Sequence, residues 1–413
     1  MNGDQYILVI GAAHIDVFAN YEGEISSKID KPGKIEFSLG GTAFNVAANL
    51  AFDQEKACLI TAVNPHKISG LCVEASLKAR KISNHFLVKN TNLSEGAYVA
   101  FIQDGDLVSA VTQTPIEELS LDEENLVGAI NNASIVVADC NLSDSQLARV
   151  VSHCSKYQKP ILIAGVSENK AERIKFVPKH LEIDVFSLNY KEAIHLFNGH
   201  QYIYDYLIFN NEDTKRIESW SSSTIQEVCS KLCTKYLIVT KGKDGHLVLS
   251  KTGNRCSFST DRVNGKFVSS SGAGDALLAG VAQYYKIYNT NPGWEPDWTK
   301  CNEIVKRYVG KVLCIQQASP TNATNSASPL IFIEQILCQD KDNNKFNYKV
   351  YLFSFLVVLA ISSIILTFLS KLTIPIAFLL SIIIFATLLI YNLLSEESFL
   401  RLVLSDKGSN SKG

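Results

Sequence analysis

The sequence lacks several patterns that would point to particular classes of protein. None of its ten cysteines forms a CxxC pair or clusters with histidine at metal-ligand spacing, which argues against a zinc module. Cys229 and Cys233, four apart on an expected helix, fit packing better than metal binding. Basic and acidic residues nearly balance, at 39 and 41, so no charge excess predicts a nucleic-acid partner. There is no internal repeat, and the chain enters a strand-like run at 6–10 without the pattern of a signal peptide. These features favour a cytosolic enzyme with reduced thiols.

Residues 1–338 alternate apolar strand-like runs with helical patterns. This alternation predicts an α/β domain with a mostly parallel sheet that helices cover on both faces. Its buried strands are expected at 6–10, 57–62, 134–138, 161–164, 184–187 and 236–240. Two further segments, 16–40 and 97–111, alternate polar and apolar residues as half-exposed antiparallel strands do. We expect them to form a small β-sheet lid.

The character of the chain changes after residue 338. A polar linker at 339–349 leads into two uncharged segments, 350–370 and 372–395, which a single lysine separates. At 1.5 Å per residue, each could cross a hydrocarbon core of about 30 Å. The pattern predicts a transmembrane helical hairpin over 350–395 and a tail over 396–413, the alternative being two buried core helices. Basic residues outside both spans predict that the soluble domain and both termini are cytoplasmic.

The first candidate site is the segment Ser269-Ser270-Ser271-Gly272-Ala273-Gly274-Asp275, which a small, apolar run follows. A glycine-rich turn that opens a helix presents backbone N–H groups at the positive end of the helix dipole, where anions bind. An acid in that first turn lies beside the bound anion. The pattern therefore predicts a phosphoryl-transfer site with Asp275 as its base. For the segment alone, a tight turn that merely lets the helix pack closely is an equal alternative.

A second candidate site lies near the N-terminus, in the segments 10–16, 32–35 and 39–47. The first segment ends in Asp16, whose carboxylate could accept hydrogen bonds from adjacent hydroxyls of a polyol. Gly40 and Gly41 permit close approach of the backbone, and Asn45 offers a donor and an acceptor to a sugar hydroxyl. Taken singly, Asp16 could equally be a turn residue and Asn45 a surface amide.

These two elements, in this order, resemble the ribokinase-like carbohydrate kinase family, also called the PfkB family, over about residues 5–338. The resemblance implies ATP-dependent phosphoryl transfer, assisted by Mg²⁺, to a hydroxyl of a sugar or nucleoside. It implies that Asp275 is the catalytic base and that Gly272, Ala273 and Gly274 form an anion hole. It also implies that the sugar is held by Asp16, Gly40, Gly41 and Asn45.

Two more segments fit the same family. Asn189-Tyr190-Lys191-Glu192 matches its NxxE motif, which implies nucleotide binding at Asn189 and an indirect, water-mediated role of Glu192 toward magnesium. Asn and Glu at this spacing are also a helix capping box, and we expect both roles. The segment 238–245 matches the strand and turn that contact ATP, which implies contacts from Thr240, Gly242 and Gly245.

Within the family, the segments 11–17, 32–35 and 135–143 are similar to those of the bacterial pseudouridine kinases. This similarity implies phosphorylation of the 5′-hydroxyl of pseudouridine, with Asp139 as a further substrate contact. The chain departs from the usual pattern at Phe44, at Ala164-Gly165 and at Ser269, where the family often has Arg, Asp-Pro and Asp. Ribokinase, fructokinase and purine nucleoside kinase activities, and a membrane-tethered nucleoside sensor without turnover, remain alternatives. A homodimer formed through the lid is a further expectation.

Overall fold

The computed structural model describes residues 5–23, 32–104, 106–198, 217–259, 272–289 and 293–313. The chain divides into two units, Met1–Ile336 and Leu337–Gly413, and every described residue belongs to the first. In the described ranges, no helix combines the length and the apolar character needed to cross a bilayer. The expected linker, transmembrane hairpin and tail, and Ser269 to Ser271, lie outside the described residues.

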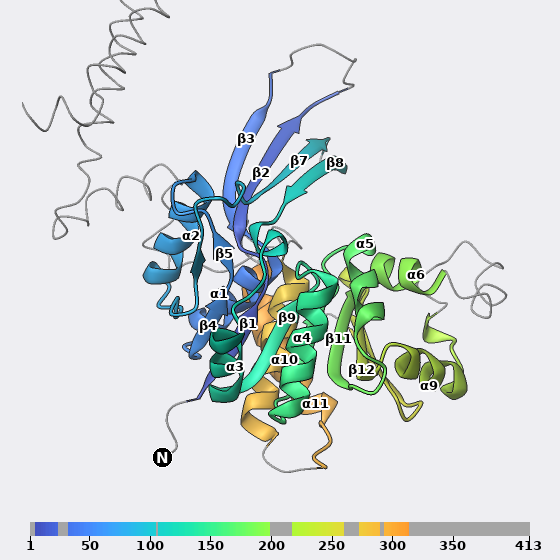
Figure 1. Cartoon of the computed structure of the whole chain (residues 1–413). Coiled ribbons are helices and arrows are strands. Elements are labelled where there is room, and N and C mark those ends of the chain that lie inside the picture. The colour runs from blue at the N-terminus through green and yellow to red at the C-terminus, as the bar shows by residue number, and fades with distance from the viewer. Residues whose placement is uncertain are drawn as a thin grey trace, which may run out of the picture. The chain divides into compact units, whose positions relative to one another are not determined.

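The main sheet has eight strands in the order β14-β13-β12-β11-β10-β9-β1-β4 (Figure 1). Neighbouring strands from β4 to β12 pair in parallel, and β13 and β14 add an antiparallel edge. The strands are β1 (Tyr6–Ile10), β4 (Ala57–Ile60), β9 (Ala133–Asp139), β10 (Ile161–Ala164), β11 (Ile183–Asn189), β12 (Thr234–Thr240), β13 (His246–Ser250) and β14 (Arg255–Phe258). All six strands expected from buried apolar runs are confirmed, because such runs are typical of a sheet covered on both faces.

Helices cover both faces of this sheet, as the alternating pattern predicted. One face carries α1 (Thr42–Phe52), α2 (Ile68–Ala79), α10 (Ala273–Tyr288) and α11 (Trp298–Leu313). The other carries α3 (Glu123–Asn132), α4 (Asp144–Lys156), α5 (Glu168–Ala171), η2 (Glu172–Phe176), α6 (Tyr190–Asn198) and α9 (Ser222–Lys231). Each face contributes its own cluster of buried side chains. The sheet therefore separates two hydrophobic cores.

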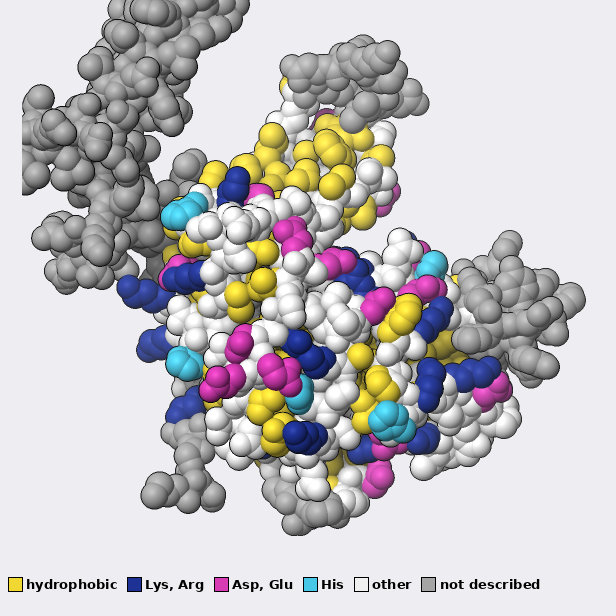
Figure 2. All heavy atoms as spheres, viewed as in Figure 1, with side chains coloured by type: hydrophobic (Ala, Val, Ile, Leu, Met, Phe, Trp, Pro, Cys, Tyr) yellow, Lys and Arg dark blue, Asp and Glu magenta, His cyan; other side chains and the backbone are white. Residues whose placement is uncertain are grey.

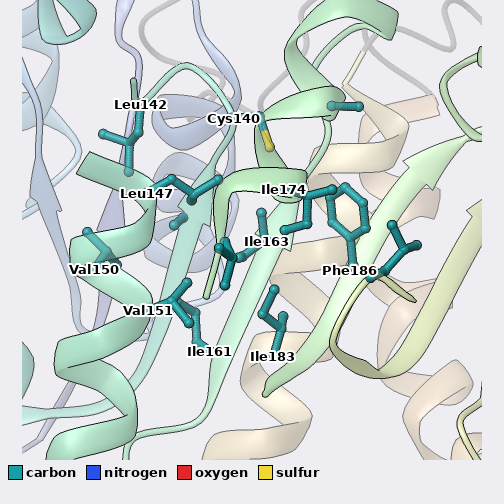
Figure 3. Packing of buried hydrophobic residues seen from close by; sticks show 14 of the residues in the cluster. Cys140, Leu142, Leu147, Val150, Val151, Ile161, Ile163, Ile174, Ile183 and Phe186 are labelled. Carbon is teal, nitrogen blue, oxygen red and sulfur yellow. The ribbon is translucent and has the colours of Figure 1, made fainter. Parts of the chain in front are cut away.

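Figure 3 shows part of the second core, where α4 packs against the sheet. Leu147, Val150 and Val151 lie along the buried side of α4, and Ile161 and Ile163 of β10 point toward them. All five side chains are at most 1% exposed. Burial of one such aliphatic side chain contributes about 1.5 to 3 kcal/mol. This packing holds the ends of β9 and β10 in fixed positions, and the site described below lies at those ends.

The two segments predicted to project do form a separate sheet, called here the small sheet, in the order β3-β2-β7-β8. Its strands are β2 (His14–Tyr21), β3 (Lys34–Gly40), β7 (Ala97–Gln103) and β8 (Asp106–Gln113). The central pair β2 and β7 is parallel, whereas β2–β3 and β7–β8 are antiparallel. The expectation of antiparallel strands throughout was wrong for this central pair. Alternation of polar and apolar residues indicates that a strand is half-exposed, but it does not indicate whether the neighbouring strand runs parallel or antiparallel. Short connecting elements are β5 (Ala62–Val63), β6 (Val88–Lys89), η1 (Pro115–Glu118) and η3 (Gly242–Asp244).

The cysteines of the described ranges are all free, and Cys256 is the exposed one among them. Cys229 and Cys233 are both buried, and their sulfurs approach the carbonyl oxygens of Leu249 and Lys179. The described residues hold no group of three His, Cys, Asp or Glu side chains that could bind a metal ion. The packing interpretation of this cysteine pair is consistent with these positions.

Candidate active site

The predicted site residues come together at one edge of the main sheet. The parallel strands β1, β9, β10, β11 and β12 all end there. Gly11 follows β1, and the other four strands end in Asp139, Ala164, Asn189 and Thr240, in that order. Ala164 lies directly opposite Asp139 in the sheet, and Asn189 lies opposite Thr240. Ligands of open α/β sheets bind outside the carboxyl ends of the strands. Helices α1 and α10 begin at the same edge, so their N-terminal N–H groups complete its lining.

The central contact of the site joins Asp275 to Asn45. The Asn45 side-chain amide donates a hydrogen bond of 2.8 Å to Asp275 Oδ2 across 230 residues of sequence. Asn45 is in the first turn of α1 and Asp275 in the first turn of α10, and the two helices pack side by side. The oxygen of the same amide, Asn45 Oδ1, is buried without a hydrogen-bond partner in the protein. The contact brings the two candidate sites of the sequence into one place.

Asp275 is a carboxylic acid suited to exchange protons at neutral pH. Burial raises the pKa of Asp275 to about 7, the Asn45 hydrogen bond opposes the shift, and the carboxylates of Asp139, Asp16 and Glu192 add to it. Its helix begins at Gly272, which has a φ of 75° and no side chain to cap the helix. Gly272, Ala273 and Gly274 thus lie at the helix N-terminus as predicted, and the N–H groups of a first turn have no partner within the helix.

Asp16 extends from the small sheet toward the same region. Its Oδ1 lies 3.0 Å from His14 Nδ1, and both side chains are close to nine-tenths buried. Gly40, on the paired strand β3, leaves room for this carboxylate, because a Cβ there would lie 2.1 Å from Asp16 Oδ2. Gly40 therefore places the Asp16 carboxylate, which explains why the pattern needs glycine at this position.

Gly41 has a structural role that follows from its backbone. It precedes α1 with a φ of 96°, and a Cβ there would lie 2.4 Å from the carbonyl oxygen of Ala12. That same oxygen accepts a hydrogen bond from Phe44 N–H. Phe44, at the position where the family often has Arg, is fully buried beneath the guanidinium of Arg80. The loop after β1 and the start of α1 are thus in direct contact.

Asp139 ends β9 with a buried carboxylate that is hydrogen-bonded to the backbone. Its side chain is 1% exposed, and its oxygens accept hydrogen bonds from the N–H groups of Ala12, Ala43 and Asn141, at 2.9 to 3.1 Å. Burial raises the pKa of Asp139 against these hydrogen bonds. The contacts tie β9 to the ends of β1 and α1, the segments that carry Asp16 and Asn45. A direct contact of Asp139 with the substrate stays a prediction.

The Asn189 and Glu192 pair forms the capping box that the spacing allowed. Asn189 N–H and Nδ2 donate to the two oxygens of Glu192 at 2.9 and 2.5 Å, and Glu192 N–H donates to Asn189 Oδ1 at 2.9 Å. Glu192 is 4% exposed, and burial raises its pKa to about 7, opposed by the Asn189 backbone hydrogen bond. Both oxygens of Glu192 are therefore engaged within its own helix turn.

The predicted nucleotide turn lies next to this pair. Thr240 ends β12 half-buried, directly beside Asn189 on β11. The turn that follows contains Gly242 and Gly245, which have φ values of 60° and 85°. Lys241 N–H donates to Gly245 carbonyl oxygen at 2.7 Å and closes the turn. The backbone of this turn therefore borders the same sheet edge as Asp275, and its contacts with ATP stay a prediction.

Sequence reasoning missed a polar group formed by Lys170, Asn141 and Thr114. Lys170 Nζ donates to Asn141 Oδ1 at 2.6 Å and reaches Thr114 Oγ1 at 3.4 Å. Burial lowers the pKa of Lys170, and nearby acids, Glu117 first among them, oppose the shift. Asn141 could have been found, since it follows the buried strand by two residues, but Lys170 lies on a four-residue helix without periodicity.

The described residues fit a magnesium ion held chiefly by nucleotide phosphates. They contain no cluster of three acidic, histidine or cysteine side chains, and the Glu192 oxygens are already hydrogen-bonded. Mg²⁺ commonly binds through one or two carboxylates, several waters and substrate phosphates. Asp275 at the start of α10 and Glu192 at the start of α6 are the acids that we expect to contact the waters of such an ion.

Comparison with known proteins settles the family. A family model described as pfkB family carbohydrate kinase matches residues 4–285, about two thirds of the chain. The chain belongs to this family. PfkB kinases are phosphotransferases with an alcohol acceptor, and they use ATP with Mg²⁺. This enzyme class and these cofactors agree with the interpretation of the Gly272–Asp275 segment.

Similar proteins within the pfkB family differ in the substrates that their names give. Pseudouridine kinase of Escherichia coli (strain K12) is 26% identical over 288 residues, which are 68% of this chain and 84% of that protein. Guanosine-inosine kinase of Exiguobacterium acetylicum is 26% identical over 286 residues, 67% of this chain and 86% of that protein. Among solved structures, Arabidopsis thaliana ribokinase complexed with ribose and ATP matches with a TM-score of 0.61 at 16% identity, covering 81% of this chain and 99% of that one. This likeness shows the ribokinase-like fold.

Proposed function

We propose that this kinase phosphorylates the 5′-hydroxyl of a nucleoside, with pseudouridine as its preferred substrate. The observation that carries the proposal is the 2.8 Å hydrogen bond from Asn45 to Asp275. It joins the acid at the N-terminus of α10 to the segment that also contains Gly40 and Gly41 and lies beside Asp16. A polyol held by Asp16 and Asn45 would thus present a hydroxyl to Asp275.

In this proposal Asp275 removes the proton of the attacking hydroxyl. A pKa of about 7 leaves a substantial ionised fraction at neutral pH and still allows the acid to hold a proton, the balance that general-base catalysis favours. The N–H groups of Gly272, Ala273 and Gly274 would donate to phosphoryl oxygens as charge grows on them. Bound Mg²⁺ would supply charge neutralisation for the phosphates of ATP.

The acceptor would be held from two sides. Asp16, with its carboxylate fixed between His14 and Gly40, would accept hydrogen bonds from ribose hydroxyls. Lys170 uses two of its three N–H donors on Asn141 and Thr114. The third could donate to a carbonyl oxygen of the base, and uracil-type bases carry two such oxygens. This arrangement favours a nucleoside over a free sugar.

The test is the purified full chain with ATP and Mg²⁺ and a panel of pseudouridine, uridine, guanosine, inosine, adenosine, ribose and fructose. We expect the highest kcat/KM with pseudouridine, because polar groups left unpaired penalise analogues that lack a matching partner. A purine nucleoside or ribose as the best acceptor would replace the substrate assignment and leave the kinase assignment intact. Binding without any phosphate transfer would instead indicate a nucleoside sensor.

We further propose a homodimer that forms through the small sheet. Apolar side chains gather over these strands in Figure 2, and the exposed ones are Ile35, Phe37, Phe101, Leu107, Val108 and Val111. Exposed apolar side chains gathered in this way typically mark an interaction surface. The mass measured by light scattering should correspond to two chains, and Val111→Lys should give one. A monomeric parent protein would contradict the proposal.

We also propose that residues 350–395 anchor the kinase to a membrane, with the catalytic unit and both termini in the cytoplasm. The support is the sequence, which has two uncharged segments of spanning length with basic residues outside both. The full chain should stay with membranes during carbonate extraction, and truncation after Cys338 should release an active protein. Recovery of the full chain without detergent would refute the anchor.

A further inference from the structure

The connection from β10 to α5 contains an unusual backbone conformation. Val166 has a φ of 74°, and the N–H of Ser167 donates to the carbonyl oxygen of Gly165 at 2.9 Å. A hydrogen bond between residues two apart defines a γ-turn, and the form with positive φ is rare and strained. The strain is greater for a β-branched residue, whose side chain crowds the backbone in the left-handed region.

The other described non-glycine residues with positive φ have ordinary explanations. Gln54, Lys81, Gln158 and Cys233 each follow the end of a helix, and Asp104 lies in the turn between β7 and β8. Left-handed residues are common at helix C-termini and in tight turns. Val166 is the β-branched residue of this group, and it leads from a strand into a helix at the candidate site. Such strain concentrates at functional sites, where the surrounding structure maintains it.

The surrounding structure holds this turn from both neighbouring strands. Gly165 N–H donates to Ser187 carbonyl oxygen on β11, and Cys140 N–H, just after β9, donates to Ala164 carbonyl oxygen, both at 2.9 Å. The Val166 side chain packs against the buried core of that face. A Cβ on Gly165 would lie 2.8 Å from Glu192 Oε2. The turn therefore has little freedom to relax to a more favourable φ.

The turn determines where the next helix begins. Helix α5 starts two residues after Val166 and is only four residues long, so its direction depends on the turn as well as on its packing against α6 and η2. Lys170 lies on this helix and reaches across to Asn141 and Thr114, which belong to the ends of β9 and β8. An extended backbone at Val166 would continue the direction of β10 and would carry Lys170 away from both.

We propose that Val166 is a positioning residue that, through its left-handed backbone, holds the Lys170 ammonium beside Asn141 and Thr114 at the carboxyl edge of the main sheet. The inference rests on the proposed function in one respect, namely that Lys170 contacts the acceptor. Val166 itself touches no substrate. Its effect on acceptor binding therefore passes through Lys170.

A double-mutant cycle tests this dependence. Proline fixes φ near −65°, so Val166→Pro excludes the conformation of this turn. We expect Val166→Pro to raise the KM of the best acceptor of the panel roughly 5- to 10-fold and to leave the KM of ATP within about 2-fold, because a small misplacement of a substrate contact has such an effect. In a Lys170→Met background, Val166→Pro should add less than about 2-fold, since residues that act through one contact are not additive. The control is Val166→Gly, which adopts a positive φ without strain and should change neither KM.

Lysine NMR of the ¹³C-methylated protein provides a readout that is independent of turnover. Burial lowers the pKa of Lys170 in the parent protein, and the signal is assigned by its loss in Lys170→Met. The titration of this signal should move toward that of an ordinary lysine in Val166→Pro and stay unchanged in Val166→Gly. If the parent protein phosphorylated no nucleoside, the proposed function would fail while this titration still decided the role of Val166.

Additive KM effects, or a Lys170 titration that Val166→Pro leaves unchanged, would overturn the inference. Should Val166→Pro fold poorly, Val166→Gly and Val166→Asn still test the inference, because glycine and asparagine tolerate a positive φ. Both variants should retain the parent Lys170 titration and acceptor KM. A shifted titration in both would mean that the side chain rather than the backbone positions Lys170, and would equally overturn the inference.

Discussion

Two acids occupy the same position at the start of two helices, and they differ in what surrounds them. Asp275 and Glu192 are each the third residue of a helix, α10 and α6, and burial raises the pKa of each to about 7. Glu192 lies three residues after Asn189, which donates hydrogen bonds to both oxygens of the Glu192 carboxylate in a capping box. Asp275 follows Gly272, which has no side chain, and its hydrogen bond comes from Asn45 on another helix.

The difference shows that helix position and pKa alone do not identify a catalytic acid. A local cap engages the carboxylate in its own helix, whereas a glycine before the helix leaves the acid and its N–H groups available to a ligand. We therefore assign proton transfer to Asp275 and a mainly structural role to Glu192. The following experiments would sharpen or break this comparison.

The largest effect is expected from Asp275→Asn. The amide keeps the shape of the side chain but cannot accept the proton, so kcat should fall at least about 100-fold, the usual lower range for loss of a general base. Binding of ATP and nucleoside, measured by calorimetry, should stay close to that of the parent protein. Glu192→Gln is the matched control, because Gln preserves a capping box. A near-normal rate for Asp275→Asn would reverse the comparison.

A smaller effect is expected from Gly40→Ala. The new Cβ would lie 2.1 Å from Asp16 Oδ2, so the carboxylate must move away from the acceptor. The KM of the nucleoside should rise about 10-fold, in line with loss of a hydrogen bond to a charged group, while the KM of ATP stays unchanged. Gly128→Ala is the control, since nothing lies within 4 Å of its Cβ. Equal behaviour of the two variants would remove Asp16 from the acceptor site.

The capping role of Glu192 predicts an effect on stability. Glu192→Ala removes the partner of Asn189 and should lower the free energy of unfolding by about 1 kcal/mol, which is typical for loss of a cap. Glu192→Gln should cost less. Urea denaturation measures both. Unchanged stability of Glu192→Ala together with a large loss of kcat would show that Glu192 belongs to the catalytic machinery.

The last of these effects concerns the stability of Asp275→Asn at different pH values. The pKa of Asp275 is raised in the folded state, so folding favours the protonated acid, and the stability of the parent protein decreases as pH rises from about 4 to about 7. The variant has no charge to bury there. Its Tm should exceed that of the parent by a few degrees at pH 8, with little difference at pH 4. A lower Tm at pH 8 would contradict the raised pKa.

Much of this arrangement could be predicted from the sequence. The buried strands were identifiable because parallel strands in a covered sheet are continuously apolar, and Gly272–Asp275 because glycines and an acid at a helix start serve anion chemistry. The parallel pairing of β2 with β7 could not be predicted, since polar and apolar residues alternate in the same way in parallel and antiparallel strands. The enclosure of Asp139 by backbone donors and the reach of Lys170 depend on contacts between distant segments, which no local pattern contains.

The most direct test of the central claim is the pH dependence of the single-turnover rate constant with ATP and the best nucleoside. Both acids have a pKa of about 7, so the parent profile alone cannot separate them. We predict a rate that falls below about pH 7 and a midpoint that Glu192→Gln lowers only slightly, because the Glu192 carboxylate makes the smallest contribution to the raised pKa of Asp275. Asn45→Ala should move it upward, because the Asn45 hydrogen bond lowers the pKa of Asp275. A midpoint that Asn45→Ala left unchanged and Glu192→Gln abolished would contradict the assignment of Asp275 as the base.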